Sequence, residues 1–402
     1  MASRLGASFD KLFAAAGISN LGDGIMGAAF PLLVASLTRD PLLVSGASLA
    51  GRLPWFLFAL VSGALVDRMD RRKVMVVTDA LRAAGLGMLA FGIAAGEAGL
   101  VAIYLVAFGL GVAETFFDTS AEALIPNLVG GDHLATANGR LQGLEWVGGS
   151  FVGPPIGAAL FALAAASPFA VNAVSFAAAA VLVALVPGRH RGHAAASGIG
   201  ASIAEGLRWL WSQRVVRTLA FMAGTTNFFT QAVVAVFVLF AQDILGVPDA
   251  WFGVLLASLG VGGLIGAVAG PRMVSAWGAG TTLRISVVGE IVSVGLFTFV
   301  ASPWPAGVLM ALYGFQVTAW NVVSVSLRQQ LTPDEMRGRV AGASRLLAWG
   351  PQPLGALAGG LLASWFGLRA PFLVGGLAFL VMLALSWQVT SNRSLAAARA
   401  AA

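Results

Sequence analysis

The sequence of 402 residues lacks cysteine altogether and contains only three histidines. Without cysteine, the chain can form neither a disulfide framework nor a thiolate metal site. The histidines, His133, His190 and His193, fall in predicted loops, where they form no zinc-binding pattern. The sequence also shows no phosphate-binding loop and no nucleophile triad. We therefore expect a protein that is not an enzyme and that uses no cofactor or metal.

Charge is also scarce, because Asp, Glu, Lys and Arg make up 10% of the chain, whereas about a quarter is usual in soluble domains. Hydrophobic residues make up 58%, in runs long enough to cross a bilayer. Lipid offers the backbone no hydrogen-bond partners, so runs of this kind form helices. The 51 glycines favour close packing between those helices. The sequence therefore predicts an all-α membrane protein in contact with the lipid bilayer.

The apolar runs predict about twelve membrane-spanning helices in two sets of six. The predicted spans of the first set are 12–37, 42–66, 74–95, 99–125, 138–163 and 167–187, and those of the second set are 216–242, 250–273, 280–300, 304–328, 340–364 and 369–390. The longest polar break separates the two sets. We expect a six-helix bundle over 1–187, a cytoplasmic linker with an amphipathic helix over 188–215, and a second six-helix bundle with a short tail over 216–402.

The distribution of Lys and Arg predicts the orientation of these helices. Basic residues concentrate in the loops on the side of both termini, whereas the opposite side has only Arg39 and Arg369. Because basic loops stay in the cytoplasm, both termini should be cytoplasmic, in a multi-pass protein of the cell's inner (plasma) membrane. This bias accounts for the net charge of +6, which gives no reason to expect nucleic-acid binding.

The two halves of the sequence also resemble each other. At one constant offset, Trp146 corresponds to Trp349 and Gly157 corresponds to Gly360. Two parallel six-helix halves around a site at the middle of the membrane are typical of secondary transporters.

The segment GALVDRMDRR joins the second and third predicted spans and concentrates charge. It resembles the loop signature of the major facilitator superfamily, although Asp70 stands where that family usually has glycine. The matching residues are Gly63, Asp67, Arg68, Arg71 and Arg72. The resemblance implies twelve transmembrane helices in two pseudo-symmetric six-helix bundles, and transport by alternating access.

A second motif lies in the fifth predicted span. There Gly149, Gly153, Pro154 and Gly157 resemble the glycine- and proline-rich motif of proton-coupled exporters in the same superfamily. The glycines recur every four residues on one helix face, which lets a neighbouring backbone come close. Proline removes a backbone donor and should kink the helix. The motif favours an exporter, and ordinary small-residue packing is the alternative.

Ionisable residues inside predicted spans are candidates for proton coupling, because charge is costly there. Asp23 and Arg52 fall near the middle of their spans and could form a buried pair. Glu114 lies nearer the midplane than the other acids of its span. We expect Asp23, Glu114 and Arg52 to couple proton movement to transport. The alternatives are a permanent structural bridge for Asp23 with Arg52 and a local hydrogen-bonded acid for Glu114.

A cytoplasmic gate network is expected where the signature loop meets the fourth span. The acids of that span recur every four residues along one face, and like charges in line need cations nearby. The resemblance implies that a network of this kind closes the cytoplasmic side. Its predicted members are Gly63, Asp67, Arg68, Arg71, Arg72, Asp118, Glu122 and Glu145.

Two other features inside spans are assigned structural roles. Asp79 and Arg82 lie three residues apart and can pair on one helix face. Glu290 falls in the middle of the ninth span, which the resemblance implies is peripheral. An unpaired glutamate at that depth would be hard to explain.

The resemblance implies a substrate cavity lined chiefly by the first, fourth, seventh and tenth spans. The expected lining residues are Asn20, Asp23, Glu114, Asn227, Gln231, Gln316, Trp320 and Asn321. An apolar pocket with a few polar anchors suits amphiphilic small molecules better than sugars.

The sequence thus predicts a monomeric secondary transporter that exports amphiphilic small molecules in exchange for protons. One alternative is a dedicated exporter of a siderophore, another natural product or a lipid. A site centred on Arg52 would favour anionic cargo, and one centred on Asp23 and Glu114 would favour cationic cargo. An alternative from a different class is a membrane sensor or assembly partner that transports nothing.

Overall fold

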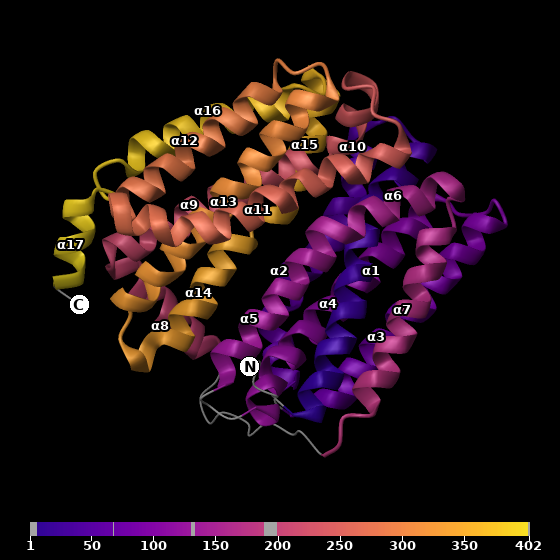
Figure 1. The fold of residues 1–402 in the computed structure, drawn as a ribbon, viewed down its shortest axis with the longest axis horizontal. Helices are drawn as coiled ribbons and strands as arrows, with labels where there is room; N and C mark the ends of the chain where they lie inside the picture. The colour runs from indigo at the N-terminus through magenta and orange to yellow at the C-terminus, as the bar shows by residue number, and fades with distance from the viewer. Residues whose placement is uncertain (1–5, 67, 130–132, 189–198, 401–402) are drawn as a thin grey trace. The chain divides into compact units, whose positions relative to one another are not determined.

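The computed structural model describes residues 6–66, 68–129, 133–188 and 199–400, and these residues form helices and no strand (Figure 1). The first half contains α1 (Ala7–Leu37), α2 (Pro41–Val66), α3 (Arg71–Ala94), α4 (Leu100–Leu128), α5 (Leu134–Glu145), the π-helix η2 (Trp146–Val152), α6 (Gly153–Leu163) and α7 (Ser167–Ala184). The second half contains α8 (Ile199–Ser212), α9 (Arg214–Val234), α10 (Phe237–Leu239), the π-helix η3 (Phe240–Ile244), α11 (Asp249–Trp277), α12 (Ala279–Phe297), α13 (Pro303–Leu331), the 3-10 helix η4 (Asp334–Met336), α14 (Arg337–Trp349), α15 (Gln352–Phe366), α16 (Ala370–Ser386) and α17 (Asn392–Ala400).

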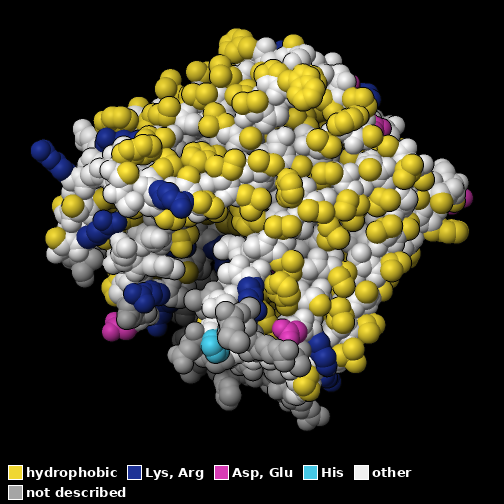
Figure 2. Space-filling model, viewed as in Figure 1, with side chains coloured by type: hydrophobic (Ala, Val, Ile, Leu, Met, Phe, Trp, Pro, Cys, Tyr) yellow, Lys and Arg dark blue, Asp and Glu magenta, His cyan; other side chains and the backbone are white. Residues whose placement is uncertain are grey.

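The surface of these helices is apolar, as expected for a protein in lipid. Large side chains such as those of Leu163 and Trp304 are 82% and 86% exposed, and hydrophobic side chains cover much of the face in Figure 2. In the described part of the chain, eight helices are long and apolar enough to cross a membrane, or nine if the pair bent by 47° after Val234 is one span. The predicted all-α membrane class is confirmed, and the number twelve stays a prediction.

The chain divides into two compact units. Unit 1 comprises Met1–Thr38, Ala50–Ala196 and Pro248–Ala257, and unit 2 comprises Arg39–Leu49, Ser197–Val247 and Ser258–Ala402. In unit 1, α3 packs against α4 and α7, and α1 packs against α6 and α7. In unit 2, α12 packs against α13 and α16, and α9 packs against α14, α15 and α16. The predicted boundaries at 187 and 215 stay predictions.

The amphipathic pattern of the linker gives α8, which packs against α14. Leu210 is fully buried in a core cluster of unit 2, and Leu207 packs on the same cluster. On the polar side, Arg339 Nη1 donates to Glu205 Oε1 at 2.8 Å, and both side chains are exposed. Several Lys and Arg side chains gather around α8, α14 and α17 on the face shown in Figure 2.

The C-terminal tail forms α17, which the sequence did not predict. Asn392 begins this helix and ties it to the junction of α11 and α12: its Oδ1 accepts from Gly280 N of α12 at 2.8 Å, and its Nδ2 donates to Trp277 O of α11 at 3.0 Å. Arg284 lies over the Trp387 ring at 3.9 Å from its centroid and donates to the Trp387 carbonyl. The end of the chain is thereby fixed to α12.

The signature loop is anchored by the first residues of α3. Asp70 is the N-cap of this helix, and its Oδ1 accepts from Arg72 N at 3.2 Å. Arg71 Nη1 donates to Ala123 O near the end of α4 at 2.8 Å, and Arg72 Nη1 donates to Val186 O just after α7 at 2.8 Å. Asp70, the departure from the family signature, therefore satisfies a backbone donor, and the arginines satisfy carbonyls where neighbouring helices end.

The capping role of Asp70 makes a testable prediction. Asp70→Ala should lower the stability by about 1 kcal/mol, because the donor on Arg72 loses its acceptor. Asp70→Asn keeps an acceptor oxygen and Asp70→Gly restores the family residue, so both should cost only a few tenths of a kcal/mol. The measurement is the apparent melting temperature in detergent. Equal melting temperatures for the Ala and Asn variants would show that the cap contributes nothing.

Candidate functional site

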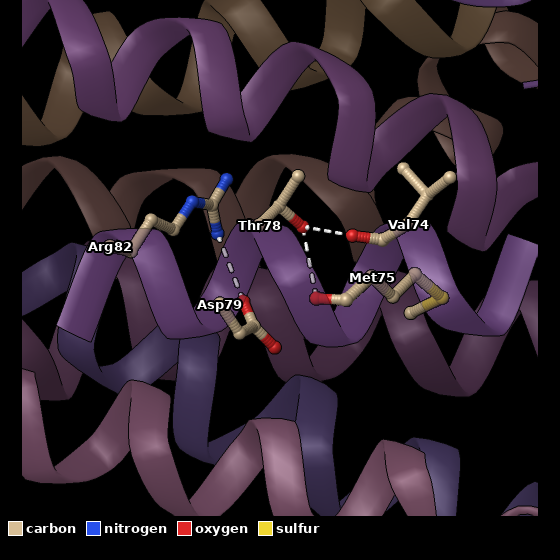
Figure 3. A network of polar contacts seen from close by, with 5 residues as sticks. All are labelled: Val74, Met75, Thr78, Asp79 and Arg82. Atoms are coloured by element: carbon tan, nitrogen blue, oxygen red, sulfur yellow. Dashed lines mark hydrogen bonds and ion pairs between the residues drawn. The ribbon is translucent and has the colours of Figure 1, made fainter. Parts of the chain in front are cut away.

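The interior of unit 1 contains an ion pair within α3. Arg82 Nη1 lies 3.6 Å from Asp79 Oδ1, and the two side chains are 3% and 0% exposed (Figure 3). The guanidinium also lies against the rings of Phe117 of α4 and Phe176 of α7, at 5.1 and 5.0 Å from their centroids. The predicted pairing of Asp79 with Arg82 is confirmed. The aromatic faces add cation–π attraction, which strengthens when water is excluded.

Arg82 also attracts acids on two other helices, Asp23 of α1 and Asp118 of α4. Asp23 of α1 is attracted by Arg82 and repelled by Glu114 of α4 and Glu145 of α5. Asp118 of α4 is repelled by the same acids and attracted by Arg82. We call Asp23, Glu114, Asp118 and Glu145 the acidic cluster. The predicted pairing of Asp23 with Arg52 stays a prediction.

The acidic cluster is accessible, whereas its cation is not. Asp23 and Glu145 are exposed, and Glu114 and Asp118 are half-buried. Arg82 is buried at 3% exposure, beneath the rings of Phe117 and Phe176. A solute reaching this part of unit 1 therefore meets carboxylates. Sequence reasoning gave Arg82 only a structural role, and its spacing to Asp79 alone does not reveal the additional acids that it faces.

The exporter motif packs its glycines against α1, directly beside Asp23. A Cβ atom on Gly153 would lie 2.6 Å from Gly24 Cα, and one on Gly157 would lie 2.2 Å from Ile25 O. The contact is reciprocal, because a Cβ on Gly24 would lie 2.5 Å from Gly148 O. No side chain fits at these distances, so the glycines permit backbone-to-backbone contact. The sequence did not single out Gly24, although LGDGIMG places it next to Asp23.

The prolines of the motif shape the same helix. Residues Trp146–Val152 form a π-helix, and α6 begins at Gly153 with Pro154 and Pro155 in its first turn. The Gly153 N–H donates to Gly148 O, five residues earlier. Each proline lacks the N–H that a regular helix would use, which favours a local change of register. The span from Thr136 to Leu163 thus continues through an irregular turn rather than stopping.

Of the predicted gate residues, Asp118 and Glu145 belong to the acidic cluster, whereas Arg71, Arg72 and Glu122 lie where α3 begins and α4 ends. Asp67 lies outside the described residues. Arg68 is exposed, Gly63 is half-buried, and Arg71 and Arg72 make the carbonyl contacts given above. Glu122 is exposed and repels Glu145. A network that joins the arginines to the acids stays a prediction.

The cavity residues predicted from unit 2 fall in different environments. Asn227 Oδ1 accepts from Gln352 Nε2 of α15 at 3.1 Å. Gln231 and Gln316 are buried at 7% and 3% exposure, and Gln316 lies against Gly289 of α12. The others are half-buried Trp320, which packs on the core clusters of unit 2, and exposed Asn321.

Asn20, the remaining predicted cavity residue, belongs to unit 1. It is half-buried on α1, and its backbone faces the motif, because a Cβ on Gly148 would lie 3.4 Å from Asn20 C. A shared cavity lined by all of these residues stays a prediction.

Comparison with known proteins gives a consistent result over nearly the whole chain. Residues 5–401 match the family model described as transmembrane secretion effector. The chain is 31% identical to the multidrug efflux pump Tap of Mycolicibacterium fortuitum over 390 residues, covering 92% of each chain. It is 28% identical over 403 residues to the enterobactin exporter EntS of Shigella boydii serotype 4 (strain Sb227), covering 94% of this chain and 92% of that protein.

The fold is likewise shared with solved structures. A bacterial homologue of the iron transporter ferroportin, in an inward-facing state, superposes with a TM-score of 0.79 at 20% identity, covering 97% of this chain and 100% of that one.

The packing of the motif glycines predicts a strong dependence on their size. Gly153→Ala should lower the stability by about 1–3 kcal/mol and reduce transport, because its methyl group must push apart two backbones. Gly143→Ala is the matched control, since a Cβ there meets nothing within 4 Å, and it should be neutral or slightly stabilising. Melting temperatures in detergent and transport in proteoliposomes measure both effects. A Gly153→Ala protein that equals the Gly143→Ala protein would contradict the contact with Gly24.

Proposed function

The chain belongs to the transmembrane secretion effector family of the major facilitator superfamily and is an efflux transporter, not an enzyme; from that premise we propose that it exports cationic amphiphilic molecules in exchange for protons. The acidic cluster of unit 1 is the observation that carries the proposal. The relatives are named as a multidrug efflux pump and an enterobactin exporter. The sign of the charge that a solute can reach in this chain therefore decides between cationic and anionic cargo.

The cluster supports proton exchange because its carboxyl groups outnumber the one buried cation, Arg82, that attracts them. Asp23, Asp118 and Asp79 all act on Arg82, while the acids repel one another. Repulsion among carboxylates is relieved when one of them takes up a proton or when a cation approaches. A cationic cargo supplies the missing positive charge and lets the carboxyl groups ionise. Proton and cation thus compete for one site, which is the requirement for exchange.

The exposure of the charges supports cationic cargo over anionic cargo. Asp23 and Glu145 are accessible, whereas Arg82 is buried between aromatic rings and cannot reach a solute. An anionic siderophore would have to approach exposed carboxylates, which costs free energy. Half-buried Arg52 keeps a second candidate open, because its guanidinium would attract an anion such as the enterobactin exported by the relative EntS.

We also propose that the protein lies in the cell's inner membrane as a monomer, with both termini in the cytoplasm. The support is the bias of Lys and Arg toward the loops on the side of the termini. Export then requires the acidic cluster to open alternately to the two sides of the membrane. Inward movement of protons down their gradient drives cargo outward.

The role of Asp23 can be tested in proteoliposomes that carry a pH gradient. Asp23→Asn removes the charge and the proton that the carboxyl carries, so proton-driven transport of ethidium should fall at least tenfold. Glu97→Gln is the matched control, because this exposed carboxyl lies between α3 and α4 and outside both spans. Its transport should equal that of the wild type. If Asp23→Asn retains wild-type proton-driven transport, Asp23 has no part in coupling.

The charge of the cargo is tested by two probes in the same vesicles. Ethidium, a cation, should release protons from the wild-type protein as it is transported, and enterobactin should not. Glu114→Gln should weaken ethidium transport several-fold, because it removes one carboxylate of the cluster. Proton flux with enterobactin alone would support the siderophore alternative. Proton flux with neither probe, despite correct folding, would reject proton exchange for both.

A further inference from the structure

Unit 2 contains a buried carboxyl group that the acidic cluster of unit 1 does not include, and we propose that Glu290 of α12 is a second proton-binding site. Its protonation follows from its own surroundings, whereas its part in transport rests on the proposed proton exchange. The site would hold a proton and no larger ligand, in the packed interior where α12 meets α9 and α13.

The surroundings of Glu290 are apolar. Its side chain is 2% exposed. The core cluster around it contains the buried residues Met222, Val287, Val294, Phe379 and Met382, with Phe229, Val233, Ile291, Tyr313, Trp320 and Leu383 packed against them. A carboxylate in surroundings of this kind lacks the water that stabilises its charge.

The polar contacts of Glu290 leave one of its oxygens free. Thr226 Oγ1 donates to Glu290 Oε2 at 3.3 Å. Within the described residues, Oε1 has no hydrogen-bond partner, and neither has Nε2 of buried Gln316. Gln316 lies against Gly289, the neighbour of Glu290. One weak hydrogen bond from a hydroxyl group cannot replace a cation, so the ionised form of Glu290 is poorly stabilised.

No basic side chain on the elements around Glu290 is placed to compensate its charge, as far as the described residues show. On α12 itself, Arg284 lies six residues away, or about 9 Å along the axis, and it is bonded to Trp387. On α13, Tyr313 interacts with Glu290 but supplies no positive charge. The basic residue of α13, Arg328, lies fifteen residues beyond Tyr313, about 22 Å along the axis.

The other neighbouring helices supply no counter-charge either. The basic residues of α9 are Arg214 and Arg217, at least nine residues or about 13 Å before Thr226. Helix α16 contains no ionisable residue. Helix α17 carries Arg393 and Arg399 but is tied to the far end of α12 through Asn392. The contrast with Asp79, which has Arg82 at 3.6 Å, is direct.

A neutral, protonated Glu290 is therefore the form that these surroundings accept. They also offer a route for exchange, because Thr226, Thr230 and Tyr313 are half-buried, whereas Glu290 and Gln316 are buried. The hydroxyl groups of Thr230 and Tyr313 are hydrogen-bonded to each other. Thr226 is hydrogen-bonded to Glu290 and Tyr313 interacts with it, so these hydroxyl groups are the candidates to relay its proton. When the surroundings admit water during the transport cycle, the carboxyl loses its proton and becomes a carboxylate.

The protonation itself is tested by infrared spectroscopy of the full-length protein in lipid. The wild type at neutral pH should show the carbonyl stretch of a protonated, non-hydrated carboxyl group, and Glu290→Gln should remove that band. Asp23→Asn should leave this band in place. Thr226→Val keeps Glu290 but removes its hydrogen bond, and should shift the band. If neither substitution changes the spectrum in this region, Glu290 is ionised and the proposal is wrong.

The role of Glu290 in transport is tested by comparing uphill transport of ethidium with its exchange across the membrane. Glu290→Gln preserves the shape of the neutral carboxyl group but cannot release a proton. Uphill transport driven by a pH gradient should fall at least tenfold, whereas exchange of ethidium at equal concentrations and equal pH should stay within twofold of the wild type. Equal uphill transport by Glu290→Gln and wild type would make the site purely structural. A wild type without proton-driven transport would reject the proposed function, and the infrared result would still decide the protonation of Glu290.

Discussion

Arg82 is the positive charge on which the interior of unit 1 depends. It is buried in α3, pairs with Asp79, and acts on Asp23 and Asp118 from two other helices. Its guanidinium lies against the rings of Phe117 and Phe176 and is shielded from water. Removing one member of a buried ion pair typically costs about 3–5 kcal/mol, because the other charge is left uncompensated. Here the loss of Arg82 would leave Asp79 without its ion-pair partner and would remove an attraction that Asp23 and Asp118 share.

The second constraint is the close contact between α1 and the irregular span that contains η2 and α6. Gly24 has no room for a side chain, since the carbonyl oxygens of Gly148 and Gly149 would lie 2.5 and 2.7 Å from its Cβ. Gly24 follows Asp23 directly in the sequence. A change of register in the π-helix must therefore move the backbone of α1 at the residue that carries the candidate proton site. The exporter motif therefore lies in direct backbone contact with the neighbour of Asp23, and no flexible side chain separates the two backbones.

Much of this organisation could be predicted from the sequence, because it depends on patterns that physics imposes locally. Long apolar runs predicted the membrane helices, and the spacing of Asp79 and Arg82 predicted their pair. The role of Asp70 is an N-cap, which the sequence permits but does not single out. The attraction of Arg82 for Asp23, the contact of Gly24 with the motif, and the docking of α17 depend on how residues far apart in the chain come together. Spacing along one helix carries no information about such contacts.

The two units solve the problem of a buried acid in opposite ways. The third long helix of each half, α3 and α12, carries a carboxyl group among apolar side chains. In α3 a counter-charge comes from the same helix three residues later, because Arg82 Nη1 lies 3.6 Å from Asp79 Oδ1. In α12 the nearest arginine, Arg284, is held by Trp387, and among the described residues the carboxyl group of Glu290 has Thr226 as its one hydrogen-bond partner. Since an apolar interior accepts a charge only with its partner, the same physical rule makes one helix a fixed ion pair and the other a holder of a proton.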